Sequence, residues 1–108
     1  MTVTQADIDT LTASHPQLSG NGYGPSAFAP TPVTLDEVQA AHAWIAEQPW
    51  LNAPGEISSY THKHAMETTT GTYVSNGAFI AAALLHAPAG LKVKLDDLNP
   101  AIGIKRQG

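Results

Sequence analysis

The segment from Tyr60 to Glu67 carries the densest polar chemistry of the chain. Its functional side chains are Tyr60, His62, Lys63, His64 and Glu67. On a helix, residues three and four apart are neighbours, so Tyr60, His64 and Glu67 are predicted to share one face, flanked by the other two. A histidine beside a carboxylate and a phenol can act as a general base. The same side chains can recognise a charged group of a partner.

These five residues allow a structural interpretation and two functional ones. In the structural interpretation, Lys63 and Glu67 form a surface ion pair worth about 0.3–0.5 kcal/mol, and both histidines are solvated. In the favoured functional interpretation, the five residues bind a partner, with Tyr23 and Trp50 as further aromatic anchors, because Trp and Tyr dominate interface energetics. We therefore expect a non-enzymatic protein-interaction module without catalytic residues.

Metal and cofactor chemistry has weaker support in the sequence. His62 and His64 would diverge by about 200° on a helix, so the two rings cannot chelate one ion. Zinc sites usually need three or four protein ligands, and His15, His42 and His86 would have to converge from elsewhere. The chain has no cysteine. We expect no metal and no cofactor, and keep a small histidine-based metal protein or hydrolase centred on His64 as an alternative.

The charge distribution argues against strong nucleic-acid binding. The net charge is -4, and residues 1–62 contain six Asp or Glu and no Lys or Arg. Helices over 59–70 and 76–87 would resemble a helix-turn-helix, yet the second offers only Asn76 and His86 to base edges. A weak, helix-turn-helix-like nucleic-acid binder therefore remains an alternative that ranks below protein recognition. The bases it could use are Lys63, Lys92, Lys94, Lys105 and Arg106.

Length and composition indicate one folded domain over residues 1–108. Hydrophobic residues make up 43% of the chain and charged residues 13%, which excludes a charge-driven disordered chain and a coiled coil. The N-terminal residues lack the basic and apolar regions of a secretory signal. The apolar stretch 78–89 is too short to span a bilayer. We expect a cytoplasmic protein without membrane association.

Hydrophobic periodicity and capping signals predict helices over 4–14, 35–48, 59–70 and 76–87. Thr4 and Thr34 are expected to begin the first two through capping boxes, and Ser58 to cap the third. The fourth is apolar on all sides, which predicts that it is buried at the centre. His42 lies on the apolar face of the second helix and is expected to be a core histidine with one hydrogen-bond partner.

Alternating residues over 91–95 and 101–105 predict a C-terminal hairpin packed on the central helix. The Pro- and Gly-rich segment 16–33 is predicted to wrap the outside as a loop, pinned by Leu18, Tyr23 and Phe28. Residues 1–33 are thus expected to pack loosely and residues 34–108 to form the compact core. The predicted fold class is α+β, mainly helical.

One stretch of about a third of the chain resembles a known group of sequences. The pattern is Tyr60-x-x-Lys63-His64-x-x-Glu67, followed by Gly71-x-Tyr73-Val74-Ser75-Asn76-Gly77-Ala78-Phe79-Ile80-x-Ala82-Ala83. Over about residues 57–90 it resembles small uncharacterised proteins of bacteriophages and other mobile elements. The resemblance implies that the partner is a host or phage protein, and that the module binds and blocks a host defence protein. The alanine-rich face could also pair two copies of the chain as a homo-oligomer.

Overall fold

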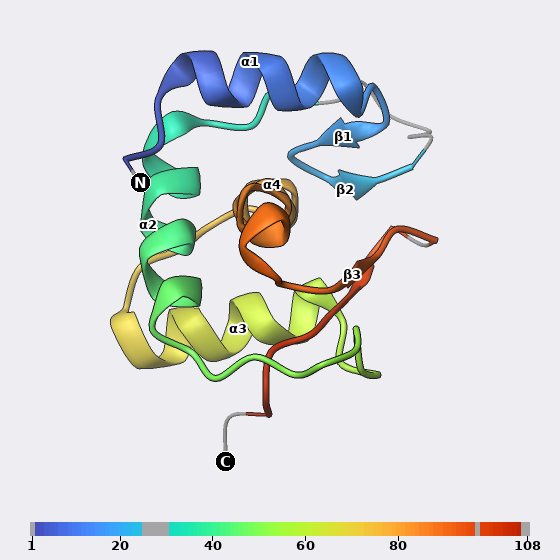
Figure 1. Cartoon of the computed structure of the whole chain (residues 1–108). Helices are drawn as coiled ribbons and strands as arrows, with labels where there is room; N and C mark the ends of the chain where they lie inside the picture. Colours follow the sequence, from blue (N-terminus) through green and yellow to red (C-terminus); the bar gives the residue numbers. More distant parts are fainter. Residues whose placement is uncertain (1, 25–30, 97, 107–108) are drawn as a thin grey trace.

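The computed structural model describes residues 2–24, 31–96 and 98–106 (Figure 1). The helices of these ranges are α1 (Gln5–Ser14), α2 (Leu35–Ala46), α3 (Ser59–Thr70) and α4 (Asn76–His86), followed by the short 3-10 helix η1 (Ala87–Ala89). The strands form two antiparallel hairpins, β1 (Leu18–Ser19) with β2 (Gly22–Tyr23) and β3 (Val93–Lys94) with β4 (Ala101–Ile102). The predicted α+β fold with a C-terminal hairpin is confirmed.

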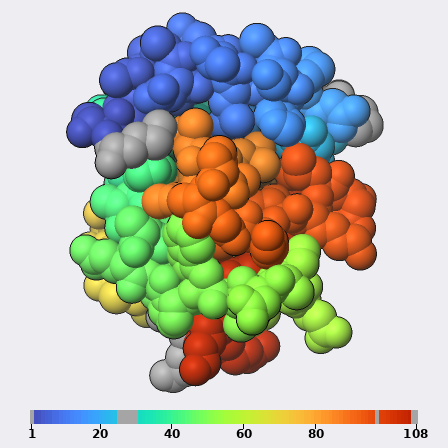
Figure 2. All heavy atoms as spheres, in the orientation of Figure 1, coloured from blue at the N-terminus to red at the C-terminus, as the bar shows by residue number. Residues whose placement is uncertain are grey.

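Helix α4 is the centre of the fold, as its composition predicted. Figure 1 shows it nearly end-on, with α1, α2 and α3 on three sides. All six residues from Ala78 to Ala83 have no exposed surface. Four of them are alanines, whose small side chains let the surrounding helices approach closely. In the space-filling view, α1 covers one side of this central helix (Figure 2).

Helix ends follow the predicted capping signals with one exception. The Thr4 hydroxyl accepts the Asp7 N–H at 3.3 Å and the Asp7 carboxylate accepts the Thr4 N–H at 2.9 Å, which confirms that capping box. Ser58 caps α3, and Gly71 ends it in the left-handed region at φ 73°. The predicted capping role of Thr34 is wrong, because its side chain makes no cap hydrogen bond.

The N-terminal segment contributes to the core and contains a hairpin that was not predicted. Val3 and Ile8 are buried, and Leu18 pairs with Tyr23 across the β1–β2 hairpin. The other predicted pin, Phe28, lies outside the described residues. Each strand of this hairpin has only two residues, which is too short for an alternation of apolar and polar residues to be recognised in the sequence.

The C-terminal hairpin is shorter than the predicted strands 91–95 and 101–105. Val93 pairs with Ile102 and Lys94 with Ala101. The residues around β4 also bond to the loop that follows α2: the Ile102 N–H donates to the Ile57 carbonyl at 3.2 Å, and Ile104 forms a bridge with Trp50. These bonds replace a longer two-stranded ribbon. No helix of the described ranges has both the length and the apolar character needed to cross a membrane.

Candidate functional site: an aromatic patch on α3

Tyr60, His64 and Tyr73 form a surface cluster that we call the aromatic patch. Tyr60 is 49% exposed and Tyr73 is 67% exposed, and both are large apolar rings. The Tyr60 and His64 rings meet edge to face with centroids 4.4 Å apart, as the i, i+4 spacing on α3 predicts. Tyr73 comes from the 71–75 connector between α3 and α4. The patch therefore joins a helix to the connector that follows it.

Lys63 lies beneath the aromatic patch instead of on the surface. It is only 5% exposed, and its ammonium donates to the Glu67 carboxylate at 2.9 Å. The same ammonium lies 5.4 Å from the centre of the Tyr60 ring and 4.8 Å from that of Tyr73. A cation at these distances is attracted to the face of each ring. The predicted surface ion pair is thus a mostly buried one that holds two tyrosines.

Glu67 connects the ion pair to the backbone of the connector. Its Oε2 accepts the Val74 N–H at 3.2 Å, and its Oε1 lies 3.3 Å from His64 Nδ1. Burial raises the pKa of Glu67, but the hydrogen bonds from Lys63 and Val74 and the nearby positive charges outweigh burial and lower it. The carboxylate therefore stays ionised while it ties α3 to the connector.

A second carboxylate holds the other end of the connector. The Glu37 side chain of α2 accepts the Ser75 N–H at 2.6 Å. Glu37 thus bonds a distant part of the chain instead of forming the predicted capping box with Thr34. With Val74 held by Glu67 and Ser75 by Glu37, the backbone on one side of Tyr73 is anchored at consecutive residues. Tyr73 is not among the site residues predicted from the sequence. Its position as a lone aromatic residue in a Gly- and Thr-rich connector is a signal that could have indicated an exposed ring.

His62 was predicted to lie on a partner-binding surface, but the structure places it in the interior. It is only 2% exposed, its Nε2 lies 3.1 Å from the Ile102 carbonyl, and its ring stacks near Phe79 with centroids 6.4 Å apart. Burial lowers its pKa, although the hydrogen bond to Ile102 opposes that effect. The spacing of Ser59, His62 and Met66 could have revealed this inward face, because residues three and four apart share one side of a helix and all three are buried.

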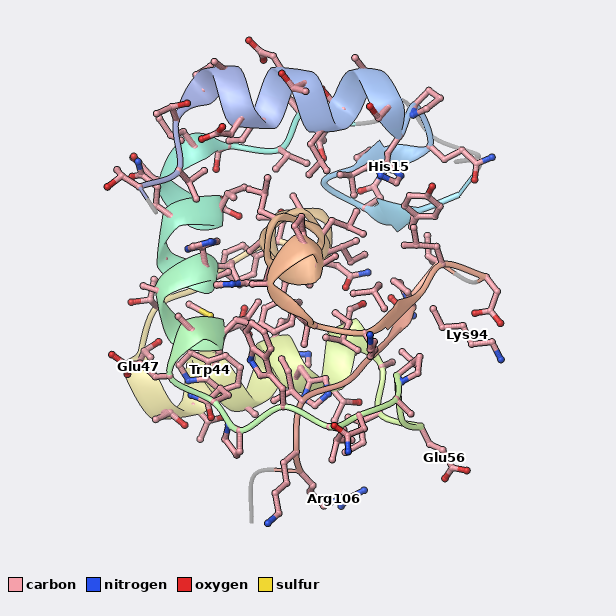
Figure 3. All side chains as sticks on the ribbon, in the orientation of Figure 1. His15, Trp44, Glu47, Glu56, Lys94 and Arg106 are labelled. Atoms are coloured by element: carbon pink, nitrogen blue, oxygen red, sulfur yellow. The ribbon has the colours of Figure 1, made fainter. Side chains whose placement is uncertain are left out.

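Tyr23 and Trp50, the other predicted anchors, are half-buried and bonded within the fold. The Tyr23 hydroxyl lies 3.0 Å from Nδ1 of His15, which Figure 3 labels near the β1–β2 hairpin. The Trp50 indole N–H donates to the Ile45 carbonyl at 3.0 Å, and its ring packs edge-on against His86. Contacts within the fold therefore explain why an aromatic residue is present at each of these two positions. Neither is included in the aromatic patch.

The alternative of a metal protein is not supported by a cluster of possible ligands within the described ranges. No three His, Cys, Asp or Glu side chains there lie close enough together to hold an ion. His62 and His64 are separated as their spacing predicted, since one is buried and the other is about half-exposed on its side chain. Comparisons with protein families, with curated proteins and with solved structures found no match for this chain. The resemblance over about residues 57–90 therefore stays a prediction.

The buried His62 predicts acid destabilisation. Its pKa is lowered from the ordinary value of 6.5, so the folded state binds its proton less readily than the unfolded state. Stability is therefore complete above pH 6.5 and falls as the pH drops below that value, by up to about 1.4 kcal/mol per pH unit until the folded pKa is reached. Urea unfolding from about pH 7.5 to about pH 5.5 measures this loss.

A His62→Gln variant provides the control for the acid effect. Glutamine retains a side-chain N–H that can donate to the Ile102 carbonyl but does not titrate. We expect the variant to lose less stability than the wild-type protein over the same pH range. Equal losses in the two proteins would show that His62 is not the source.

Proposed function

We propose that this protein is a non-enzymatic interaction module that binds another protein through the aromatic patch. The observation that carries the proposal is the exposure of Tyr60 and Tyr73 around one buried cation. Exposed single hydrophobic residues are ordinary, but these two rings are held together by Lys63 and by the anchored connector. Rings fixed before binding lose little conformational freedom in a complex, which favours affinity.

The chemistry of the patch suits a protein surface. Tyrosine offers a large apolar face and a hydroxyl, and it is enriched among the residues that dominate binding energy. The neighbouring His64 and Glu67 add polar groups at the edge of that face, where interfaces are commonly polar. The buried charge of Lys63 is balanced by Glu67, so the patch presents no strong uncompensated charge to a partner.

The alternative that α4 binds DNA as a recognition helix has little support, although α3 and α4 follow one another as in a helix-turn-helix. Asn76 and His86, the only α4 residues that we expected to reach base edges, are 7% and 8% exposed. Asn76 is bonded to Ser59 and Asn99, and α4 is enclosed by three other helices. A recognition helix must enter the major groove with its side chains free. Protein recognition is therefore the function we propose.

A double substitution of the two tyrosines tests the proposal. The Tyr60→Ser, Tyr73→Ser variant removes both exposed rings and leaves the Lys63–Glu67 pair in place. In affinity capture from an extract of the source cells, quantified by mass spectrometry, we expect at least one protein held by the wild type to be lost. Truncation of two central aromatic residues weakens binding by about 2–4 kcal/mol, or roughly 30- to 1000-fold.

Leu51→Ser is the matched control for that experiment. Leu51 is another large exposed hydrophobic residue, 37% exposed, in the loop after α2. Its substitution should leave the captured proteins unchanged, and thermal unfolding should show that both variants are folded. Retention of every wild-type partner by the folded double tyrosine variant would refute a role for the aromatic patch.

A further inference from the structure

A pair of stacked histidines joins α2 to the last residue of α4. The rings of His42 and His86 lie with centroids 3.8 Å apart and planes inclined by 12°. Each residue is 8% exposed. His86 Nε2 lies 2.9 Å from the backbone carbonyl of His42, and since a carbonyl only accepts, this nitrogen carries the proton of the bond. The predicted core histidine is therefore one half of a pair.

Within the described part of the chain, few negatively charged groups lie near the His42–His86 pair to stabilise a positive charge on the two rings. Burial lowers the pKa of His42, the charge of His86 lowers it further, and Asp7 of α1 opposes both effects. The Asp7 carboxylate is bonded to the backbone N–H and hydroxyl of Thr4. Trp50, from the loop after α2, faces His86 with its uncharged ring, at a centroid distance of 5.3 Å.

The pair also forms part of the wall of a groove of about 630 Å³. Val3, Gln39 and Leu85 line the same groove, so its wall includes residues from the N-terminal segment, α2 and α4. His86 ends α4, and the η1 residues beyond it are exposed on the face shown in Figure 2. The end of α4 is therefore next to solvent, whereas the stretch from Ala78 to Ala83 is buried.

We propose that the His42–His86 pair is a proton-controlled latch between α2 and α4, and that its release in acid widens the groove. Stacked imidazoles accommodate a single positive charge, but two like charges at this separation repel each other strongly. The second proton therefore binds only when the end of α4 moves away from α2. Because opening is coupled to the uptake of one proton, the opening equilibrium increases by up to about tenfold for each pH unit of acidification, as long as the open form binds one proton more than the closed form.

Amide hydrogen exchange across a pH series tests the latch. After correction for the intrinsic pH dependence of exchange, amides in the last turn of α4 and in η1 should open up to about tenfold more per pH unit in acid. Amides at the centre of α4 report global unfolding, including the contribution of His62. Exchange at the helix ends should therefore rise before exchange at the centre does.

Two variants separate the latch from a general effect of acid. His42→Phe keeps an aromatic ring but removes one charge, and His86→Gln keeps a donor for the His42 carbonyl but does not titrate. Each should abolish the acid-dependent opening of the helix ends, and circular dichroism checks that each is folded. Because each removes one partner of the repelling pair, either folded variant is sufficient for the comparison.

Side-chain NMR titration supplies an independent measurement. The pKa of His42 should be lower in the wild-type protein than in His86→Gln, because the charge of His86 disfavours protonation of His42. A pKa of His42 that is the same in the wild-type protein and in His86→Gln would overturn the proposal. Acid-dependent opening that persists unchanged in the folded variants would overturn it as well.

Discussion

Replacing Gly77 with alanine is expected to lower the free energy of unfolding by about 3 kcal/mol or more, the upper range for an overpacked core site. Gly77 lies in the first turn of α4, where its N–H donates to the Gly20 carbonyl at 3.1 Å. A Cβ atom added there would overlap the carbonyl oxygen of Ser19. Because the obstructing atom is backbone, relief requires β1 and α4 to separate.

Gly71→Ala is the comparison that isolates this steric effect. Gly71 has a positive φ of 73°, but a Cβ atom there would meet nothing within 4 Å. The expected loss is about 1–2 kcal/mol, from the left-handed conformation alone. Chemical denaturation of both variants measures the difference. A Gly77→Ala protein as stable as Gly71→Ala would contradict the close packing of β1 on α4.

Replacing Glu67 with alanine should lower the free energy of unfolding by about 2–4 kcal/mol, since removal of one partner leaves a buried charge unpaired. Lys63 would keep its ammonium beneath the two tyrosine rings without a counter-ion. The Val74 N–H would lose its acceptor as well. Glu67 is 19% exposed on its side chain, so water offsets part of the effect and the estimate lies below that for a fully enclosed pair.

Two further variants distinguish the charge from the hydrogen bond. Glu67→Gln keeps an acceptor for Val74 but removes the negative charge, so its loss of stability should be intermediate. The double variant Lys63→Met, Glu67→Leu removes both charges and should be much closer to the wild type, because an apolar pair can replace a buried ion pair. Urea unfolding ranks the variants. A Glu67→Ala protein within about 0.5 kcal/mol of wild type would show that the pair contributes little.

The Glu67 prediction also bears on the proposed function. The carboxylate holds both Lys63 and the backbone of the connector, and these contacts position Tyr60 and Tyr73. Loss of the carboxylate should therefore weaken partner binding even in molecules that remain folded. The double apolar variant should regain stability more completely than binding, because it restores packing without a cation between the rings.

Local signals predicted the helices well because each begins and ends through short-range contacts. The Thr4–Asp7 box, the Ser58 cap and the Gly71 stop involve residues within three or four positions, so their chemistry can be recognised in the sequence. The Thr34 prediction failed for the opposite reason. Glu37 instead accepts a hydrogen bond from Ser75, 38 residues away, and no local pattern records that competition.

Three features could be predicted from the amino-acid sequence alone: the α+β class, the central place of the apolar helix α4, and the shared face of Tyr60 and His64. These predictions rest on periodicity and composition, which are properties of residues within one or two helical turns of each other. They can therefore be recognised without knowing the rest of the fold. Three others are visible only in the folded chain: the burial of His62 and Lys63, the placement of Tyr73 near Tyr60, and the stacking of His42 on His86. Which side of a polar helix faces inward depends on contacts with residues far away in the sequence. A local sequence pattern does not show which of these contacts form or how much they stabilise the fold.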